Sequence, residues 1–108
     1  MSRQILEQVR DELLGCGAVS SNREFCISWL AKDPSYMRGL TFRNFDPSAD
    51  ALATCASKLG YYAVHLAQSS KCEQREWSER FYRLRDLCHQ AIETQARAKW
   101  MTPQRMDL

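Results

Sequence analysis

Apolar residues recur along this chain at the three- and four-residue spacing that places them on one face of a helix. No segment of the sequence alternates apolar and polar residues as a half-buried strand would. The first periodic run predicts a helix over about residues 2–14. Gly15 and Gly17 would end it, because glycine tolerates the left-handed conformation of a helix C-terminus. The side chains expected to be buried are Ile5, Leu6, Val9, Leu13 and Leu14.

The second periodic run opens with a helix-start signal. Ser21 and Glu24 have the spacing of a capping box, in which the hydroxyl accepts a hydrogen bond from the amide three residues on and the carboxylate reaches back. The helix that follows is expected to bury Phe25, Cys26, Trp29 and Leu30.

The triplet Asp-Pro-Ser occurs twice, at residues 33–35 and 46–48. Aspartate can cap the free amides of a new helix, and proline suits the first helical position because its missing N–H would be unpaired there anyway. The first triplet predicts a short helix over about residues 34–43. The second predicts a helix from Pro47 or Ser48 to about Gln68, with Ser48 as an alternative cap. The apolar face of this fourth helix would be Leu52, Cys55, Ala56, Leu59, Tyr62, Ala63 and Leu66.

The last run predicts the longest helix, over about residues 72–100. A heptad-like seam runs along it at steps of four and three residues: Trp77, Phe81, Leu84, Cys88 and Ala91. This seam could pack on the first and fourth helices, or it could pair with a second copy of the chain, and the sequence leaves both open. The pattern predicts an all-α fold, a five-helix bundle in a single domain. Helices 1–4 would occupy residues 1–70, the long helix residues 71–100 and a frayed tail residues 101–108.

Composition removes several classes of function. The 108 residues carry a formal charge of +2, which neither demands nor excludes nucleic acid. No stretch approaches the ~20 uninterrupted apolar residues of a membrane span. An odd number of widely spaced cysteines and a charged N-terminus predict reduced thiols in the cytoplasm. The two histidines, His65 and His89, are far apart, and no cysteine or histidine pair has the spacing of a metal site. No set of nucleophile, base and orienting residue can be named that would indicate an enzyme. We therefore expect no metal, no cofactor and no catalytic residues.

The second, third and fourth expected helices follow the order of a helix-turn-helix unit, in which a short helix stands out and fits the major groove of DNA. Two groups of residues in this segment are similar to the motifs of a known family. The first group is Glu24-Phe25-Cys26 and residues 33–37 with Leu40, in the expected second and third helices. The second group, in the expected fourth helix, is Pro47-Ser48, Leu52, Ala56, Leu59 and Gly60. Residues 21–60 thus resemble the core of the lambda-repressor/Cro-like transcription regulators. The segment between helices 2 and 3 is one residue longer than in that family, and Leu30, Ala31 and Lys32 stand where its turn glycine would be.

The resemblance implies a bacterial or phage transcription regulator that reads double-stranded DNA with the helix at 34–43. Met37 and Leu40 would face the core. The residues then expected to contact DNA are Arg23, Lys32, Ser35, Tyr36, Arg38, Thr41, Arg43 and Asn44. Arg38 could pair with a guanine edge, and Asn44 could read an adenine or hold a phosphate. Ser35 and Thr41 could bind phosphate, helped by the amides of the helix start.

A second chain or another protein is the other partner that the sequence suggests. Helix-turn-helix proteins often bind as dimers, because two half-sites multiply a weak single-site affinity. We expect a homodimer or partner interface at Trp77, Phe81, Leu84 and Cys88. The rival hypothesis is a helical protein-interaction module, an antiactivator or adaptor, that keeps the fold without binding DNA. It would hold its partner with Trp77, Tyr82 or Trp100.

Overall fold

The structure is a computed structural model that describes residues 2–106, and within that range it contains helices and no strand. In chain order the elements are α1 (Ser2–Gly15), α2 (Asn22–Glu24), a π-helical turn η1 (Phe25–Trp29), α3 (Tyr36–Arg43), α4 (Ala49–Ala67), α5 (Cys72–Trp100) and α6 (Pro103–Met106). The predicted all-α class and the long C-terminal helix are confirmed.

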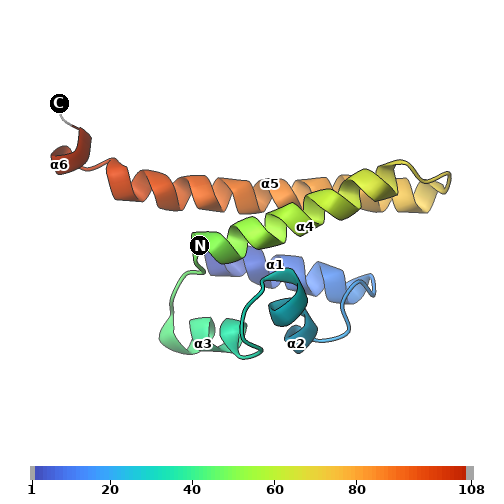
Figure 1. Cartoon of the computed structure of the whole chain (residues 1–108), viewed down its shortest axis with the longest axis horizontal. Helices are drawn as coiled ribbons and strands as arrows, with labels where there is room; N and C mark the ends of the chain where they lie inside the picture. The colour runs from blue at the N-terminus through green and yellow to red at the C-terminus, as the bar shows by residue number, and fades with distance from the viewer. Residues whose placement is uncertain (1, 107–108) are drawn as a thin grey trace.

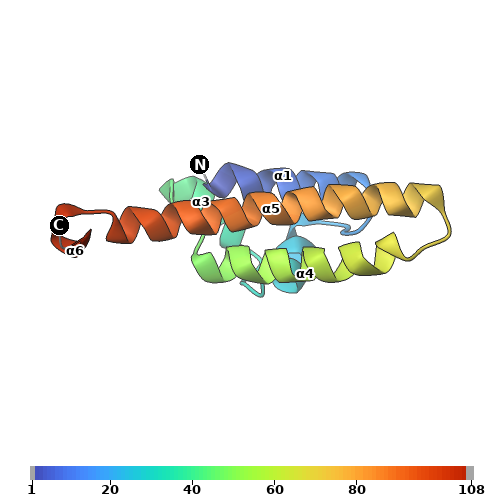
Figure 2. The same ribbon diagram turned by 90° about the horizontal axis from the view of Figure 1, so that it is seen from above.

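The three long helices form the body of the molecule. Helix α5 packs along α4 and also contacts α1, and Figure 2 shows it running between them. Two side chains of α5 tie the helices together. The buried Ser78 hydroxyl donates to the Ala63 carbonyl at 2.6 Å, and the Gln95 amide donates to the Pro47 carbonyl at 2.8 Å. The seam of α5 therefore packs within the chain, which is one of the two alternatives that the sequence left open.

Most residues expected in the core are buried, with two clear exceptions. Leu14 at the end of α1 is 38% exposed, and Tyr62 on α4 is 40% exposed. Both were expected on an apolar face. Successive helix residues are about 100° apart, so Leu14 turns away from the face on which its neighbour Leu13 is fully buried. Tyr62 lines an open pocket, which is described below.

The capping box at the second helix forms with a shift of one residue. The Glu24 amide donates to the Ser21 hydroxyl at 3.1 Å, as predicted. The Glu24 carboxylate accepts from the amide of Ser20 at 2.7 Å, rather than from that of Ser21. Phe25, Cys26, Trp29 and Leu30 are buried, as predicted.

The second helix widens into the π-helical turn η1 before it ends. Its closing bond runs from the Lys32 amide to the Cys26 carbonyl at 2.9 Å, one residue wider than the usual Schellman ending of an α-helix. The turn thereby takes up one residue more than a regular α-helical ending would. Ala31 then adopts φ 54°, the left-handed conformation for which glycine is usually selected.

Replacing Ala31 with glycine is expected to stabilise the fold. A left-handed backbone costs an L-residue roughly 1–2 kcal/mol, while the added flexibility of glycine costs roughly 0.5–1 kcal/mol, so a net gain of about 0.5–1 kcal/mol remains. Urea unfolding followed by circular dichroism measures it. Ala53→Gly, at an exposed position inside α4, is the matched control and should destabilise by about 1 kcal/mol. Equal losses in both variants would contradict the assigned conformation of Ala31.

The two Asp-Pro-Ser triplets start their helices differently. Asp33 accepts hydrogen bonds from the amide and the hydroxyl of Ser35, at 2.8 and 2.6 Å, and so closes a turn instead of capping the helix. Helix α3 begins at Tyr36, two residues later than predicted. At the second triplet Ser48 is the cap, and its hydroxyl accepts from the Ala51 amide at 3.1 Å. Here the alternative that named Ser48 is confirmed.

The C-terminal segment, for which the sequence predicts a frayed tail, contains one further helical turn. After α5 ends at Trp100, residues 103–106 form the single helical turn α6, in which the Thr102 carbonyl accepts from the amides of Arg105 and Met106 at 3.0 Å each. The remaining residues of the predicted tail, 107 and 108, lie outside the described part of the chain. None of the helices in residues 2–106 combines the length and the apolar character needed to cross a membrane.

Candidate nucleic-acid interface

Helix α3 lies at the edge of the molecule farthest from α5 (Figure 1). Met37 and Leu40 attach it to the core with exposed fractions of 2% and 7%, as predicted. The Tyr36 hydroxyl accepts from the Ser48 amide at 3.0 Å and links α3 to the start of α4. Because these contacts all lie on one side, the opposite side of the helix faces solvent.

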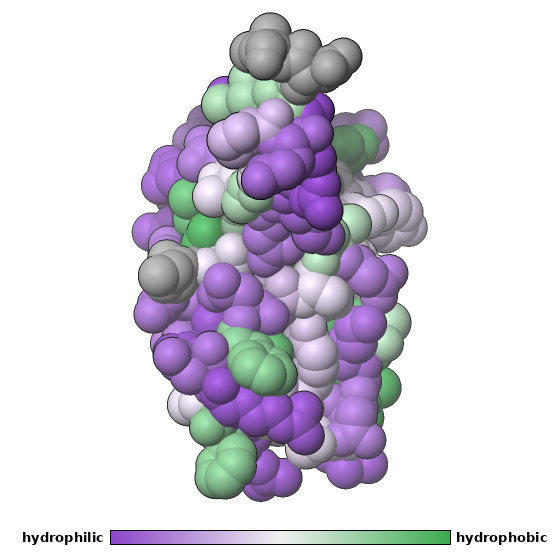
Figure 3. Space-filling model, turned by 90° about the vertical axis from the view of Figure 1, so that its left-hand side faces the viewer, coloured by the Kyte–Doolittle hydropathy of each residue, from purple (hydrophilic) through white to green (hydrophobic). Residues whose placement is uncertain are grey.

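The outer face of α3 has a distinct composition. At helical spacing it presents Ser35, Arg38, Gly39, Phe42 and Arg43, of which Phe42 is 89% exposed. The end view in Figure 3 shows isolated hydrophobic groups among hydrophilic ones over the lower part of the molecule, where α3 lies. We call these five residues the α3 outer face.

Five of the eight residues expected to contact DNA are engaged within the chain. The Ser35 hydroxyl donates to Asp33, and the Thr41 hydroxyl donates to the Met37 carbonyl at 3.1 Å. Tyr36 holds the start of α4, as described above. The Lys32 ammonium pairs with the Asp50 carboxylate at 2.9 Å, and this hydrogen bond raises the pKa of Lys32.

Asn44 has a structural role that differs from the predicted reading of adenine. It ends α3 in the left-handed conformation, with φ 55°. Its side-chain oxygen accepts from the Arg3 guanidinium at 3.0 Å. Because a bidentate contact with adenine needs both that oxygen and the amide nitrogen, Asn44 cannot make one while this bond persists.

Three arginines of the predicted set keep their charges available. Arg23, Arg38 and Arg43 are exposed, and none of them forms an ion pair within residues 2–106. Hydrogen bonds from Ser35 lower the pKa of Asp33, and the positive charges of Arg23 and Arg38 lower this pKa further. Asp33 is therefore an anion that lies near both arginines and offsets part of their charge.

Three of the four residues of the predicted dimer or partner interface on α5 are buried within the chain. Phe81, Leu84 and Cys88 are 5%, 2% and 0% exposed, because α1 and α4 cover them. Trp77 is half-buried and stacks under the Arg80 guanidinium at 4.7 Å. The seam belongs to the core of the chain, so a second copy could reach three of these four side chains only after α5 had left α4.

Three residues near α3 were not found by sequence reasoning. Arg3 reaches α3 from the start of α1 and donates to Asn44, a contact across 41 positions that no local pattern reveals. Phe42 and Phe45, which are 89% and 58% exposed, are large apolar groups in solvent. Their exposure could have been suspected from the helical register, since Met37 and Leu40 define the opposite face.

The fold and this surface define an all-α protein that holds a short, arginine-bearing helix away from its body. The chain belongs to DUF6626, a family of unknown function, whose sequence profile matches residues 6–101. No curated protein and no solved structure matches the chain.

Proposed function

We propose that this protein is a small DNA-binding transcription regulator that inserts the α3 outer face into the major groove. The observation that carries the proposal is the pair Arg38 and Arg43, whose guanidinium groups are exposed and not ion-paired within residues 2–106, on a helix set apart from the body. Arginine donates two hydrogen bonds to the guanine edge and also binds phosphate. Arg23, at the start of the second helix, supplies a further contact to the DNA backbone.

Gly39 also supports this proposal. It lies in the middle of an eight-residue helix, where glycine costs about 1 kcal/mol relative to alanine. Within the described residues no atom outside its own helix and chain neighbours would lie within 4 Å of a Cβ built at this position, so packing does not require glycine. A position without a side chain does allow another molecule to approach the backbone closely.

Gly39→Ala is therefore expected to change stability and binding in opposite directions. The fold should gain up to about 1 kcal/mol in urea unfolding, because alanine has the higher helix propensity. Binding to duplex DNA in an anisotropy titration should weaken, since the methyl group would separate α3 from the groove. The control is Gly15→Ala at the end of α1, where the space is also open, and it should leave DNA binding unchanged. Unchanged DNA binding by Gly39→Ala would show that the bare backbone is not part of the interface.

A protein partner is the second candidate function, and Phe42 is the observation that favours it. Exposed aromatic side chains are typical anchors of protein interfaces, and Phe42 and Phe45 lie three residues apart. Two of the three side chains named from the sequence for this role are less suited, because Trp77 and Tyr82 are half-buried and stack with arginines. The third, Trp100, is 47% exposed at the end of α5.

The test of DNA binding is an anisotropy titration of the full chain with a labelled generic duplex at 50 and 200 mM salt. Three arginines that each neutralise one phosphate predict a slope of about −2.7 for log affinity against log salt, so affinity should fall about 40-fold per bound copy over this range. No binding at 50 mM salt would overturn the proposal. The protein-interaction alternative would then be tested by crosslinking through a photoreactive residue at position 42.

We further propose that two copies of the chain bind DNA as a dimer, because two linked binding sites raise the overall affinity of a weakly charged surface. The seam of α5 is buried, but the C-terminal end of the molecule exposes Trp100, Met101 and Met106 to 47%, 44% and 36%. Sedimentation at tens of micromolar protein is expected to show that the wild-type chain is a dimer. The double variant Trp100→Ala/Met101→Ala is expected to sediment as a monomer. The control is Leu14→Ala, which removes a comparably exposed apolar side chain from α1. A wild-type monomer under these conditions would contradict the proposal.

A further inference from the structure

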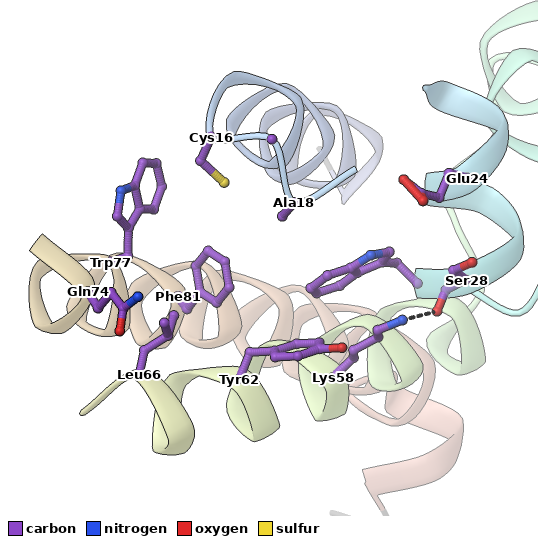
Figure 4. A pocket seen from close by; sticks show the side chains of 12 residues that line it. Cys16, Ala18, Glu24, Ser28, Lys58, Tyr62, Leu66, Gln74, Trp77 and Phe81 are labelled. Carbon is purple, nitrogen blue, oxygen red and sulfur yellow. Dashed lines mark hydrogen bonds between the residues drawn. The ribbon is translucent and has the colours of Figure 1, made fainter. Parts of the chain in front are cut away.

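A pocket opens on the side of the molecule where the loop after α1, η1, α4 and α5 meet. Its volume is about 520 Å³, within the range of roughly 300–1,000 Å³ that is usual for small-molecule sites. Figure 4 shows Cys16 and Ala18 on one side of it and Tyr62 and Leu66 on the other, with Trp77 and Phe81 projecting from α5.

Four aromatic rings line this pocket. The Trp29 ring lies 5.6 Å from Tyr62 and 6.5 Å from Phe81 between centroids, and Phe81 lies 6.1 Å from Trp77. The rings meet at steep or tilted angles and do not stack on one another. Trp29 and Phe81 are only 4% and 5% exposed, so most of the ring surface that a flat ligand could cover belongs to Tyr62, which is 40% exposed, and to the half-buried Trp77. Aromatic walls of this kind suit a planar aromatic molecule.

The charges around the rings indicate the sign of that ligand. The Lys58 ammonium lies 4.7 Å from the Trp29 centroid and donates to the Ser28 carbonyl at 2.8 Å, as the dashed line in Figure 4 marks. Lys58 forms no ion pair within residues 2–106, and two of its three N–H bonds remain for a ligand. Arg80 adds a second cation over the Trp77 ring.

A cationic ligand is disfavoured for the same reason. The protein's own cations, Lys58 and Arg80, already occupy the positions over the two tryptophan rings. Glu24 is the acidic residue that lines the pocket, and its carboxylate already accepts from the amide and hydroxyl of Ser20. An aromatic anion would meet the positive charge of Lys58 and cover the free ring surfaces at once.

We infer that this pocket binds a small planar aromatic carboxylate, with the rings among Tyr62, Trp77 and Phe81 and the carboxylate on Lys58. The inference does not depend on α3 binding DNA. The pocket nevertheless shares Trp29 with the segment that leads through Ala31 into α3.

The experiment compares three probes that share one ring system. The full chain is titrated with 2-naphthoate, neutral 2-naphthamide and cationic 2-naphthylmethylammonium, and binding is followed by amide chemical shifts in nitrogen-15 NMR. We expect 2-naphthoate to bind with a Kd on the order of 1 mM or below, as its size allows. Shifts should centre on residues 16–18, 28–29 and 58–66, and the cation should bind at least about tenfold more weakly.

Two variants and one control locate the site. Lys58→Met keeps the apolar stem and should remove the preference for the anion, while Tyr62→Ala should weaken all three probes. Val64→Ala, at a 46% exposed position on the same helix outside the pocket, should change nothing. Absence of saturable binding, a preference for the cation, or naphthoate binding that neither variant alters would each overturn the inference. Folding of each variant is read from the same spectra.

Discussion

Alanine at both Arg38 and Arg43 is expected to weaken binding to duplex DNA by about 30-fold or more at 50 mM salt. Each arginine contact to a base edge or phosphate contributes roughly 1–3 kcal/mol, and both guanidinium groups face solvent on the α3 outer face. The slope of log affinity against log salt should become less steep by about 2, because two phosphate-neutralising charges are lost. Anisotropy titrations at several salt concentrations measure both quantities.

The matched control is Lys71→Ala/Arg83→Ala. It removes the same charge from two exposed positions that form no ion pair within residues 2–106, one just before α5 and one on α5, which lies at the opposite side of the molecule from α3 (Figure 1). If net charge alone governed binding, both double variants would lose affinity equally. A loss confined to Arg38 and Arg43 would place the interface on α3, and equal losses would contradict that placement.

Phe25→Ala is expected to cost about 3–5 kcal/mol of the free energy of unfolding, the usual range for a fully buried phenylalanine. Phe25 is 0% exposed and begins η1, so its ring fastens the segment before α3 to the core. The total free energy of unfolding of a domain of this size is roughly 5–15 kcal/mol, and the variant should therefore be close to unfolding. Urea unfolding followed by circular dichroism measures the loss.

Ile27→Ala provides the comparison within the same turn. Ile27 is 44% exposed, so its truncation should change the free energy of unfolding by no more than about 0.5 kcal/mol. Similar effects of the two substitutions would show that η1 is not held to the core by Phe25.

Local signals predicted most of the helix boundaries. Ser21 and Ser48 cap the helices that follow them, and α5 has the predicted bounds, because caps and amphipathic faces depend on residues three or four positions apart. The start of α3 was predicted two residues early. The Asp33 side chain accepts from the Ser35 amide and closes a turn instead of capping the helix. The sequence alone does not show which of these two hydrogen-bonding arrangements is more stable.

The candidate interface was predicted less completely. The register of α3 already placed Met37 and Leu40 inward and Arg38 outward, and the structure agrees. The sequence did not predict which polar side chains would form hydrogen bonds or ion pairs within the chain. Lys32 meets Asp50 and Asn44 meets Arg3 across 18 and 41 positions, so these two side chains are engaged within the chain.

By itself, the sequence determined that this protein is all-α, where most of its helices begin and which residues form most of each apolar face. These properties follow from propensity, capping and periodicity, which act over one or two turns. The tertiary structure alone decided that the seam of α5 packs on α4 and α1, that the second helix widens into η1 before it ends, and that Arg23, Arg38 and Arg43 form no ion pair within residues 2–106. It also brought Trp29, Tyr62, Trp77 and Phe81 around one pocket. Each of these outcomes depends on contacts between segments that are distant in the chain. The energies of such contacts cannot be predicted from local sequence patterns.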